Sequence, residues 1–143
     1  MNKKIGLYGG FFNPFHEGHL HVIKSSIANL NLQKLIVLPT YQNPLKSNQN
    51  SKPIKSQLLN IRSQIKEPLV KVSDFEHRYQ MKCTYDVLQK ISTKCNLNSF
   101  YLIMGLDQLG HFHKWKEYEW ILKNISICAV SYTHLTLPTI FRV

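Results

Sequence analysis

The sequence predicts an α/β fold, in which a parallel β-sheet is covered by helices on both faces. Segments with strand and helix patterns alternate along the chain with short connections, which is typical of a parallel sheet. The strand segments are nearly continuous apolar runs, as expected for strands that are buried on both faces. With 143 residues, of which 43% are hydrophobic, the chain is long enough for one globular domain and its core.

Strands and helices are expected in strict alternation. The first strand, Lys4–Tyr8, is stopped by Gly9-Gly10, and the second, Lys34–Leu38, ends at Pro39. The remaining predicted strands are Leu69–Val72, Phe100–Met104 and Ile125–Ala129. The predicted helices are His19–Asn31, Ile54–Ile65, Cys83–Lys94 and Trp115–Leu122. The segment between Pro39 and Pro53 is too polar to pack in a core and is expected to be a loop.

Charge and cysteine content narrow the class of protein. The formal net charge is +10, but the lysines are spread along the chain, so the charge permits an anionic ligand without identifying one. We expect neither a nucleic-acid nor a membrane partner, because no helix carries a basic stripe and no run of about 18 apolar residues occurs. Three widely spaced cysteines and the lack of a signal peptide predict a cytoplasmic protein, and the oligomeric state stays open.

The most informative segment follows the first strand and opens the first helix. It runs Gly9-Gly10-Phe11-Phe12-Asn13-Pro14-Phe15-His16-Glu17-Gly18-His19. Paired glycines allow a tight turn, and the start of a helix presents free N–H groups to an anion. His16 and His19 share one face of the first helical turn and can donate hydrogen bonds to phosphoryl oxygens. A metal half-site that includes Glu17 and His21, or a plain helix start, remains a possible alternative.

This segment resembles the G-G-x-F-[DN]-P-x-H-x-G-H signature of the nucleotidylyltransferase superfamily, and the chain from Lys4 to about Ala129 resembles the bacterial nicotinate-nucleotide adenylyltransferases. Four downstream segments resemble motifs of that family in order: Leu38–Lys46, Lys82–Leu88, Met104–Asp107 and Phe112–Tyr118. The resemblance implies a Rossmann-like nucleotidylyltransferase fold. It also implies that ATP transfers its adenylyl group to nicotinate mononucleotide, giving nicotinate adenine dinucleotide and pyrophosphate.

The resemblance assigns roles to particular residues. The implied catalytic residues are His16, His19 and Lys46. Contacts to ATP and its phosphates are implied for Gly9, Gly10, Phe11, Phe12, Gly18, Gly105 and Asp107. Contacts to the nicotinate nucleotide are implied for Asn43, Thr84 and Trp115. Mg²⁺ is expected to accompany ATP, held by phosphate oxygens and water rather than by protein ligands.

Each of these roles has a plainer alternative. Lys46 is otherwise a solvated surface lysine, Trp115 a core residue and Asp107 the N-cap of a helix. Two positions depart from the family pattern, which usually has Ser or Thr at Phe11 and Tyr or Arg at Cys83. The other functions considered are transfer to nicotinamide mononucleotide, phosphopantetheine or a sugar phosphate, and a basic nucleotide- or RNA-binding module without catalysis.

The last residues do not resemble the family. From Val130 the sequence resembles the translation of a transposon-end sequencing adapter, and the family's later I-S-[SA]-T-x-[IV]-R segment is not found. We therefore expect an incomplete nucleotidylyltransferase domain over residues 1–129, with its C-terminal part missing, and a non-native tail over 130–143. Such a truncated chain is expected to bind ATP weakly and can be inactive.

Overall fold

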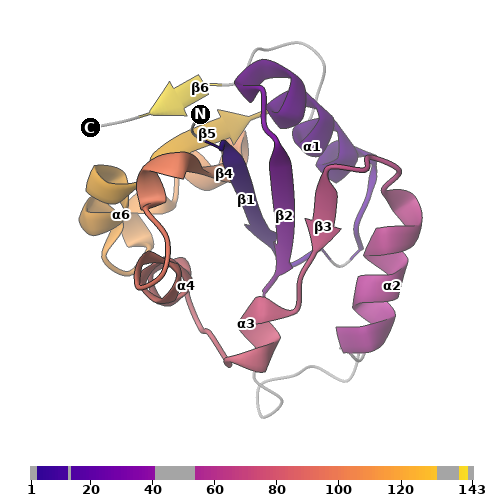
Figure 1. Ribbon diagram of the computed structural model, residues 1–143, viewed down its shortest axis with the longest axis horizontal. Helices are drawn as coiled ribbons and strands as arrows, with labels where there is room; N and C mark the ends of the chain where they lie inside the picture. Colours follow the sequence, from indigo (N-terminus) through magenta and orange to yellow (C-terminus); the bar gives the residue numbers. More distant parts are fainter. Residues whose placement is uncertain (1–2, 13, 41–53, 132–138, 142–143) are drawn as a thin grey trace.

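The computed structural model describes residues 3–12, 14–40, 54–131 and 139–141, which form one mixed β-sheet flanked by helices (Figure 1). The strands are β1 (Ile5–Gly10), β2 (Lys34–Pro39), β3 (Val70–Val72), β4 (Phe100–Gly105), β5 (Ser126–Val130) and β6 (Thr139–Phe141). Their order in the sheet is β3-β2-β1-β4-β5-β6, with β1 to β5 parallel. The predicted Rossmann-like α/β fold with a parallel sheet is confirmed.

The helices agree with the sequence pattern where they are long enough to show a period. The α-helices are α1 (Glu17–Leu30), α2 (Ile54–Gln64), α3 (Phe75–Arg78), α4 (Thr84–Ser92), α5 (Leu106–Leu109) and α6 (Tyr118–Asn124). Two short 3₁₀ turns are η2 (Leu97–Ser99) and η3 (Phe112–Lys114). The sequence did not predict α3 and α5, because a four-residue helix is too short to display an apolar periodicity.

The prediction of a helix that starts at Trp115 is wrong at its beginning. Trp115 has extended backbone angles (φ −73°, ψ 142°) and follows η3, and α6 begins only at Tyr118. Between them Glu117 has a left-handed conformation (φ 56°, ψ 39°), which no right-handed helix can contain. Neither glycine nor proline marks this turn, so no residue type in the segment predicts it.

Side chains of the strands alternate between two hydrophobic cores, one on each face of the sheet. Leu7 and Leu102 contribute to the core beneath α4 and α6, whereas Tyr8 and Ile103 contribute to the core beneath α1. Figure 1 shows α1 and α2 on one side of the sheet and α4 and α6 on the other. Burial of both faces explains why the strand segments read as continuous apolar runs.

The last described strand lies at an edge of the sheet. Thr139–Phe141 pairs antiparallel with β5, with Cys128 opposite Ile140, and β5 itself extends to Val130. Residues 132–138 lie outside the described part. A foreign origin for residues 130–143 therefore stays a prediction.

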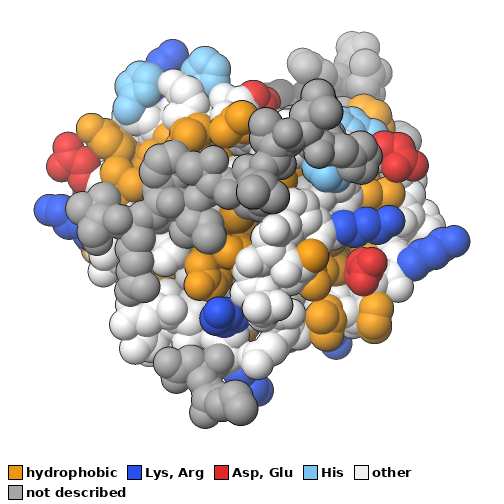
Figure 2. Space-filling model, turned by 90° about the horizontal axis from the view of Figure 1, so that it is seen from above, with side chains coloured by type: hydrophobic (Ala, Val, Ile, Leu, Met, Phe, Trp, Pro, Cys, Tyr) orange, Lys and Arg blue, Asp and Glu red, His pale blue; other side chains and the backbone are white. Residues whose placement is uncertain are grey.

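Surface features agree with a dispersed positive charge. On the face drawn in Figure 2, lysine and arginine side chains are scattered among polar and apolar ones rather than joined in one patch. None of the helices in the described ranges is long and apolar enough to span a membrane.

Candidate active site

A cavity of about 720 Å³ opens at the carboxyl ends of β1 and β4. These two strands are neighbours in the sheet, and the order of the strands reverses between them, since β2 follows β1 on one side and β5 follows β4 on the other. Ligands of doubly wound sheets bind in the crevice at this reversal. Tyr8, Gly9 and Gly10 from β1 line the cavity, together with Ile103–Gly105 from β4.

His16 and His19 both line the cavity and are fixed by reciprocal hydrogen bonds at the start of α1. His16 is the N-cap, and its Nδ1 accepts a hydrogen bond from the backbone N–H of Gly18 at 3.0 Å. The Nδ1 of His19 accepts one from the backbone N–H of His16, also at 3.0 Å. Because each Nδ1 is an acceptor, the proton of each neutral ring lies on Nε2. The helix start thus selects the tautomer of both imidazoles.

His19 lies among aromatic rings, and this surrounding keeps it neutral. Its ring centroid is 3.8 Å from that of His16, and the two rings are stacked. Three further rings lie around it, with centroid distances of 6.4 Å to Tyr8, 5.0 Å to Phe12 and 5.1 Å to Phe15. Burial, followed by the charge of His16, lowers the pKa of His19 to about 4, although nearby Asp107 acts in the opposite direction. His19 is therefore an uncharged hydrogen-bond donor near neutral pH.

The glycine segment, residues 9–12 at the carboxyl end of β1, is held in an unusual conformation. Phe12 has φ of 50°, in the left-handed region, yet its side chain is buried against His19. A Cβ at Gly10 would lie 2.8 Å from Cε1 of Phe12, so the buried ring leaves room only for glycine there. The carbonyl oxygen of Phe11 accepts a hydrogen bond of 2.8 Å from Nε2 of Gln57 in α2. The Phe11 ring itself is half-exposed on the cavity wall.

The opposite wall is formed around the start of α4 and the turn after η3. Thr84 is the first residue of α4, directly after the N-cap Cys83, and both line the cavity. Burial raises the pKa of the Cys83 thiol, so the thiol is protonated at neutral pH. Trp115 lines the cavity and also packs against the core, with its ring 5.1 Å from that of Phe112. Trp115 therefore both packs against the core and lines the cavity, and its contact with the nicotinate nucleotide stays a prediction.

The remaining residues implied by the family resemblance lie in different places. Gly105 lines the cavity as the N-cap of α5, so Asp107 is not that cap; Asp107 is exposed and does not line the cavity. Gly18 does not line the cavity either, but its N–H orients His16. Asn43 and Lys46 lie outside the described residues.

The structure adds cavity-lining residues to which the sequence analysis gave no role: Thr40, Glu76, Gln108, Lys82, Lys114 and Lys116. Glu76 is buried, and its Oε2 lies 3.9 Å from the position of a Cβ on Gly9. In sequence it sits beside Asp74 and Arg78, which form an exposed ion pair of 2.8 Å and give the segment the appearance of a surface turn. Such residues are brought to the cavity by tertiary packing, which leaves no local sequence signal.

Metal-binding side chains do not gather in this region. Within the ranges that the structure describes, no three His, Cys, Asp or Glu side chains are close enough together to hold a metal ion.

A parallel sheet with paired histidine donors at the reversal of strand order defines a nucleotidyltransferase type of site. The family model described as "Cytidylyltransferase-like" matches residues 7–142. A curated protein of Caulobacter sp. (strain K31), named "Probable nicotinate-nucleotide adenylyltransferase", is 35% identical over 128 residues, which are 90% of this chain and 68% of that protein. A protein of the same name from Methylorubrum extorquens (strain PA1) is 34% identical over 134 residues, covering 94% and 72% of the two chains.

Solved structures agree on the fold. A Vibrio parahaemolyticus structure from the nicotinate-nucleotide adenylyltransferases superposes with a TM-score of 0.75 at 23% identity, over 92% of this chain and 75% of that one. Plasmodium falciparum nicotinic acid mononucleotide adenylyltransferase complexed with NaAD gives a TM-score of 0.74 at 23% identity, over 94% and 67%. The chain belongs to the cytidylyltransferase-like family and, within it, to the nicotinate-nucleotide adenylyltransferases.

Proposed function

We propose that the chain transfers an adenylyl group from ATP to nicotinate mononucleotide, giving nicotinate adenine dinucleotide and pyrophosphate in the synthesis of NAD. The observation that carries this proposal is the hydrogen-bonded pair His16 and His19 inside a cavity of about 720 Å³, in a chain whose curated relatives bear that activity in their names. A cavity of this volume is within the range of ordinary ligand sites.

The proposed reaction is a displacement at phosphorus. A phosphate oxygen of the mononucleotide attacks the α-phosphorus of ATP, the bond from that phosphorus to the bridging oxygen breaks, and pyrophosphate leaves with the bonding electron pair. Negative charge then shifts to the phosphoryl oxygens in the transition state. Donors that are already oriented toward this charge stabilise it without reorganisation. Because Nε2 of His16 and of His19 carries the proton, both rings are such donors.

The neutral state of His19 suits it to donate a hydrogen bond to the phosphates. A neutral ring with Nδ1 occupied by a backbone N–H can turn only its Nε2–H toward the phosphates. Gly9 lines the cavity and has no side chain, so the triphosphate can approach its backbone closely, whereas the place of a side chain at Gly10 is taken by the Phe12 ring. ATP is expected to enter as its Mg²⁺ complex, so that the cation arrives with the substrate.

The nicotinate nucleotide is assigned to the opposite wall. Trp115 offers a flat aromatic face suited to the pyridine ring, and the Thr84 hydroxyl can donate to its carboxylate. Asn43 and Lys46 keep their proposed roles, as a contact to this nucleotide and as a loop cation for the phosphates. A cytoplasmic location is likewise proposed, and it is consistent with the free thiols Cys83, Cys95 and Cys128.

The activity can be tested by following pyrophosphate release from ATP with a panel of acceptors: nicotinate mononucleotide, nicotinamide mononucleotide, phosphopantetheine and a sugar phosphate. The proposal expects release with nicotinate mononucleotide, together with formation of the dinucleotide by chromatography. The variant His19→Gln tests the imidazole itself, because glutamine at the third helical position can keep the capping box while the imidazole is lost. Salt-sensitive nucleotide binding without turnover, unchanged in His19→Gln, would favour the binding module instead.

A further inference from the structure

We propose that His77 of α3 is a positioning residue for phosphate binding, because it holds Thr40 and, through Thr40, the backbone of the glycine segment. This inference rests on the proposed function, since the phosphates concerned are those of ATP. His77 is not among the residues that line the cavity, so it acts through the backbone and does not touch the substrate itself.

Two consecutive carbonyl groups of the glycine segment accept hydrogen bonds from the protein. The carbonyl oxygen of Gly10 accepts one of 2.8 Å from the backbone N–H of Thr40, and that of Phe11 accepts one of 2.8 Å from Nε2 of Gln57. A carbonyl oxygen carries partial negative charge and would repel a phosphate, whereas a backbone N–H attracts one. The two bonds therefore favour a backbone conformation in which protein donors, rather than the ligand, meet these oxygens.

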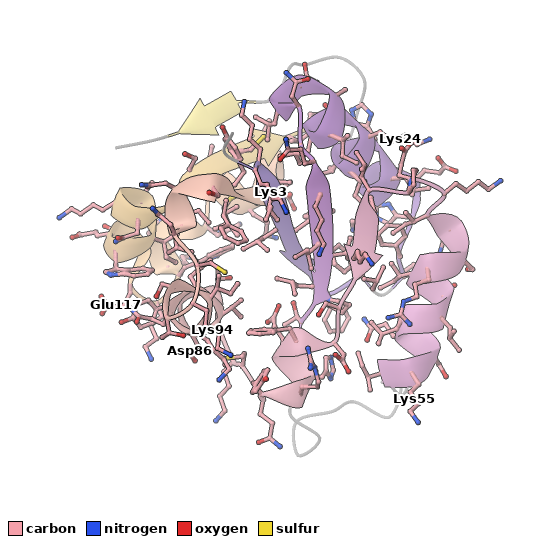
Figure 3. All side chains as sticks on the ribbon, in the orientation of Figure 1. Lys3, Lys24, Lys55, Asp86, Lys94 and Glu117 are labelled. Carbon is pink, nitrogen blue, oxygen red and sulfur yellow. The ribbon has the colours of Figure 1, made fainter. Side chains whose placement is uncertain are left out.

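The donor to Phe11 is fixed by the orientation of α2. Figure 3 shows Lys55, in the first turn of this helix, with its side chain directed away from the sheet. Gln57 follows two residues later, which is about 200° further around the helix axis, and so faces the opposite way. The helix thus presents Gln57 to the glycine segment and Lys55 to solvent. The donor to Gly10, in contrast, is a backbone group and depends on what holds Thr40.

Thr40 is held from two sides. Its N–H donates to Gly10 in β1, and its carbonyl oxygen lies 3.1 Å from Nε2 of His77. A carbonyl oxygen can only accept, so Nε2 of His77 carries the proton of this hydrogen bond. Burial lowers the pKa of His77, although the bond to Thr40 and the charge of Asp74 act in the opposite direction. Thr40 itself lines the cavity, so the pair of bonds fixes one edge of it.

The short helix α3 is itself tied to β2, which gives His77 a fixed base. The backbone N–H of Ser73 donates to the carbonyl of Val37 at 2.9 Å, and the hydroxyl of Ser73 accepts from the N–H of Phe75 at the start of α3 at 3.2 Å. In Figure 3, α3 lies next to the carboxyl ends of β1 and β2. The connection from β3 to α3 thus bonds to β2 at Val37 and again, through His77, just beyond its end.

The test compares two substitutions of His77 by calorimetry with ATP and, separately, with nicotinate mononucleotide. His77→Leu removes the donor to Thr40, and we expect the affinity for ATP to fall roughly 3- to 10-fold with little change for the mononucleotide. His77→Gln, whose amide can still donate, is expected to bind ATP as the wild type does. His111→Leu is the control for loss of an imidazole, since His111 is exposed, lies outside the cavity lining and makes no side-chain capping bond.

Amide hydrogen exchange at Thr40, followed by NMR, measures the proposed restraint itself. We expect exchange to be about tenfold faster in His77→Leu and unchanged in His77→Gln. Equal ATP affinities of the wild type and His77→Leu, equal losses for both nucleotides, or a His77→Gln protein as impaired as His77→Leu overturns the inference. Binding is measured without turnover, so a chain whose ATP affinity depends on His77 but that forms no dinucleotide contradicts the proposed function and supports the positioning role.

Discussion

The Nδ1 atom of His19 accepts a hydrogen bond from the backbone N–H of His16, while Nδ1 of His16 accepts one from the N–H of Gly18. The two histidines thus stabilise the start of α1 in addition to their proposed role in catalysis. Their Nδ1 atoms accept the backbone hydrogen bonds that cap α1, and we propose that their Nε2–H groups donate to a phosphate in the cavity. Four predictions, beyond the tests given above, follow from this arrangement and from the contacts around it.

The first prediction concerns the stability of the protein at acid pH. The folded state lowers the pKa of His19 from 6.5 to about 4, so between these values the unfolded chain binds more protons at this residue than the folded chain. The contribution of His19 is fully present above pH 6.5 and is lost as the pH falls toward 4. The melting temperature of the wild type is expected to fall relative to that of His19→Gln as the pH falls over this range. His77, whose pKa burial also lowers, is unchanged in both proteins and cancels from the comparison. A difference in melting temperature that stays constant between these pH values would refute a neutral His19.

The second prediction tests the hydrogen bond between α2 and the glycine segment. In Gln57→Ala the carbonyl of Phe11 loses its donor, and the segment is no longer tied to α2. We expect the KM for ATP to rise roughly 3- to 10-fold, with little change in the KM for the nicotinate nucleotide. Gln64→Ala is the matched control on the same helix, because among the described residues Gln64 bonds to Asn60, within α2. Equal effects of the two substitutions, or an equal change in both KM values, would contradict a role of the Gln57–Phe11 hydrogen bond in ATP binding.

The third prediction concerns the space at Gly10. In Gly10→Ala the new methyl group would overlap the buried ring of Phe12, which packs against His19. The expected cost in the free energy of unfolding is about 1–3 kcal/mol, with a loss of activity because the ring displaces the imidazole. Gly110→Ala is the control, since its nearest neighbour would lie at an ordinary 3.8 Å. Denaturant unfolding curves measure the free energy of unfolding of both variants. A Gly10→Ala protein as stable and active as Gly110→Ala would contradict the close packing of the Phe12 ring on Gly10.

Much of the fold could be predicted because its signals are local. The apolar runs that became β1 and β2 could be recognised without knowledge of tertiary structure, although β1 continues through Gly9 and Gly10, which were expected to stop it, and β2 includes Pro39. The histidine segment could be placed at the end of a strand for the same reason. By contrast, no pattern in the sequence predicts the left-handed conformation of Glu117 or the four-residue helix α5.

The cavity wall was predicted less completely than the histidine segment. Lys116 and Glu76 reach the cavity from turns that look like ordinary charged surface in the sequence. The hydrogen bond between Gln57 and Phe11 joins residues 46 positions apart, a relationship that no spacing rule predicts. The histidine pair could therefore be identified from the sequence alone. The tautomers of the two rings, the lowered pKa of His19 and the charged residues that line the cavity could be recognised only in the structure.

The central claim, that the Nε2–H groups of the histidine pair act on phosphate while the Nδ1 atoms cap the helix, is tested most directly by His16→Asn. Asparagine can accept the N–H of Gly18 as an N-cap but cannot reproduce the Nε2 donor of the imidazole. The measurement is the rate of nicotinate adenine dinucleotide formation from ATP and nicotinate mononucleotide, beside the thermal melt of the same sample. We predict an unchanged melting temperature and a rate lower by about 10²- to 10³-fold than that of the wild type. A folded His16→Asn protein that forms the dinucleotide at the wild-type rate would contradict the account.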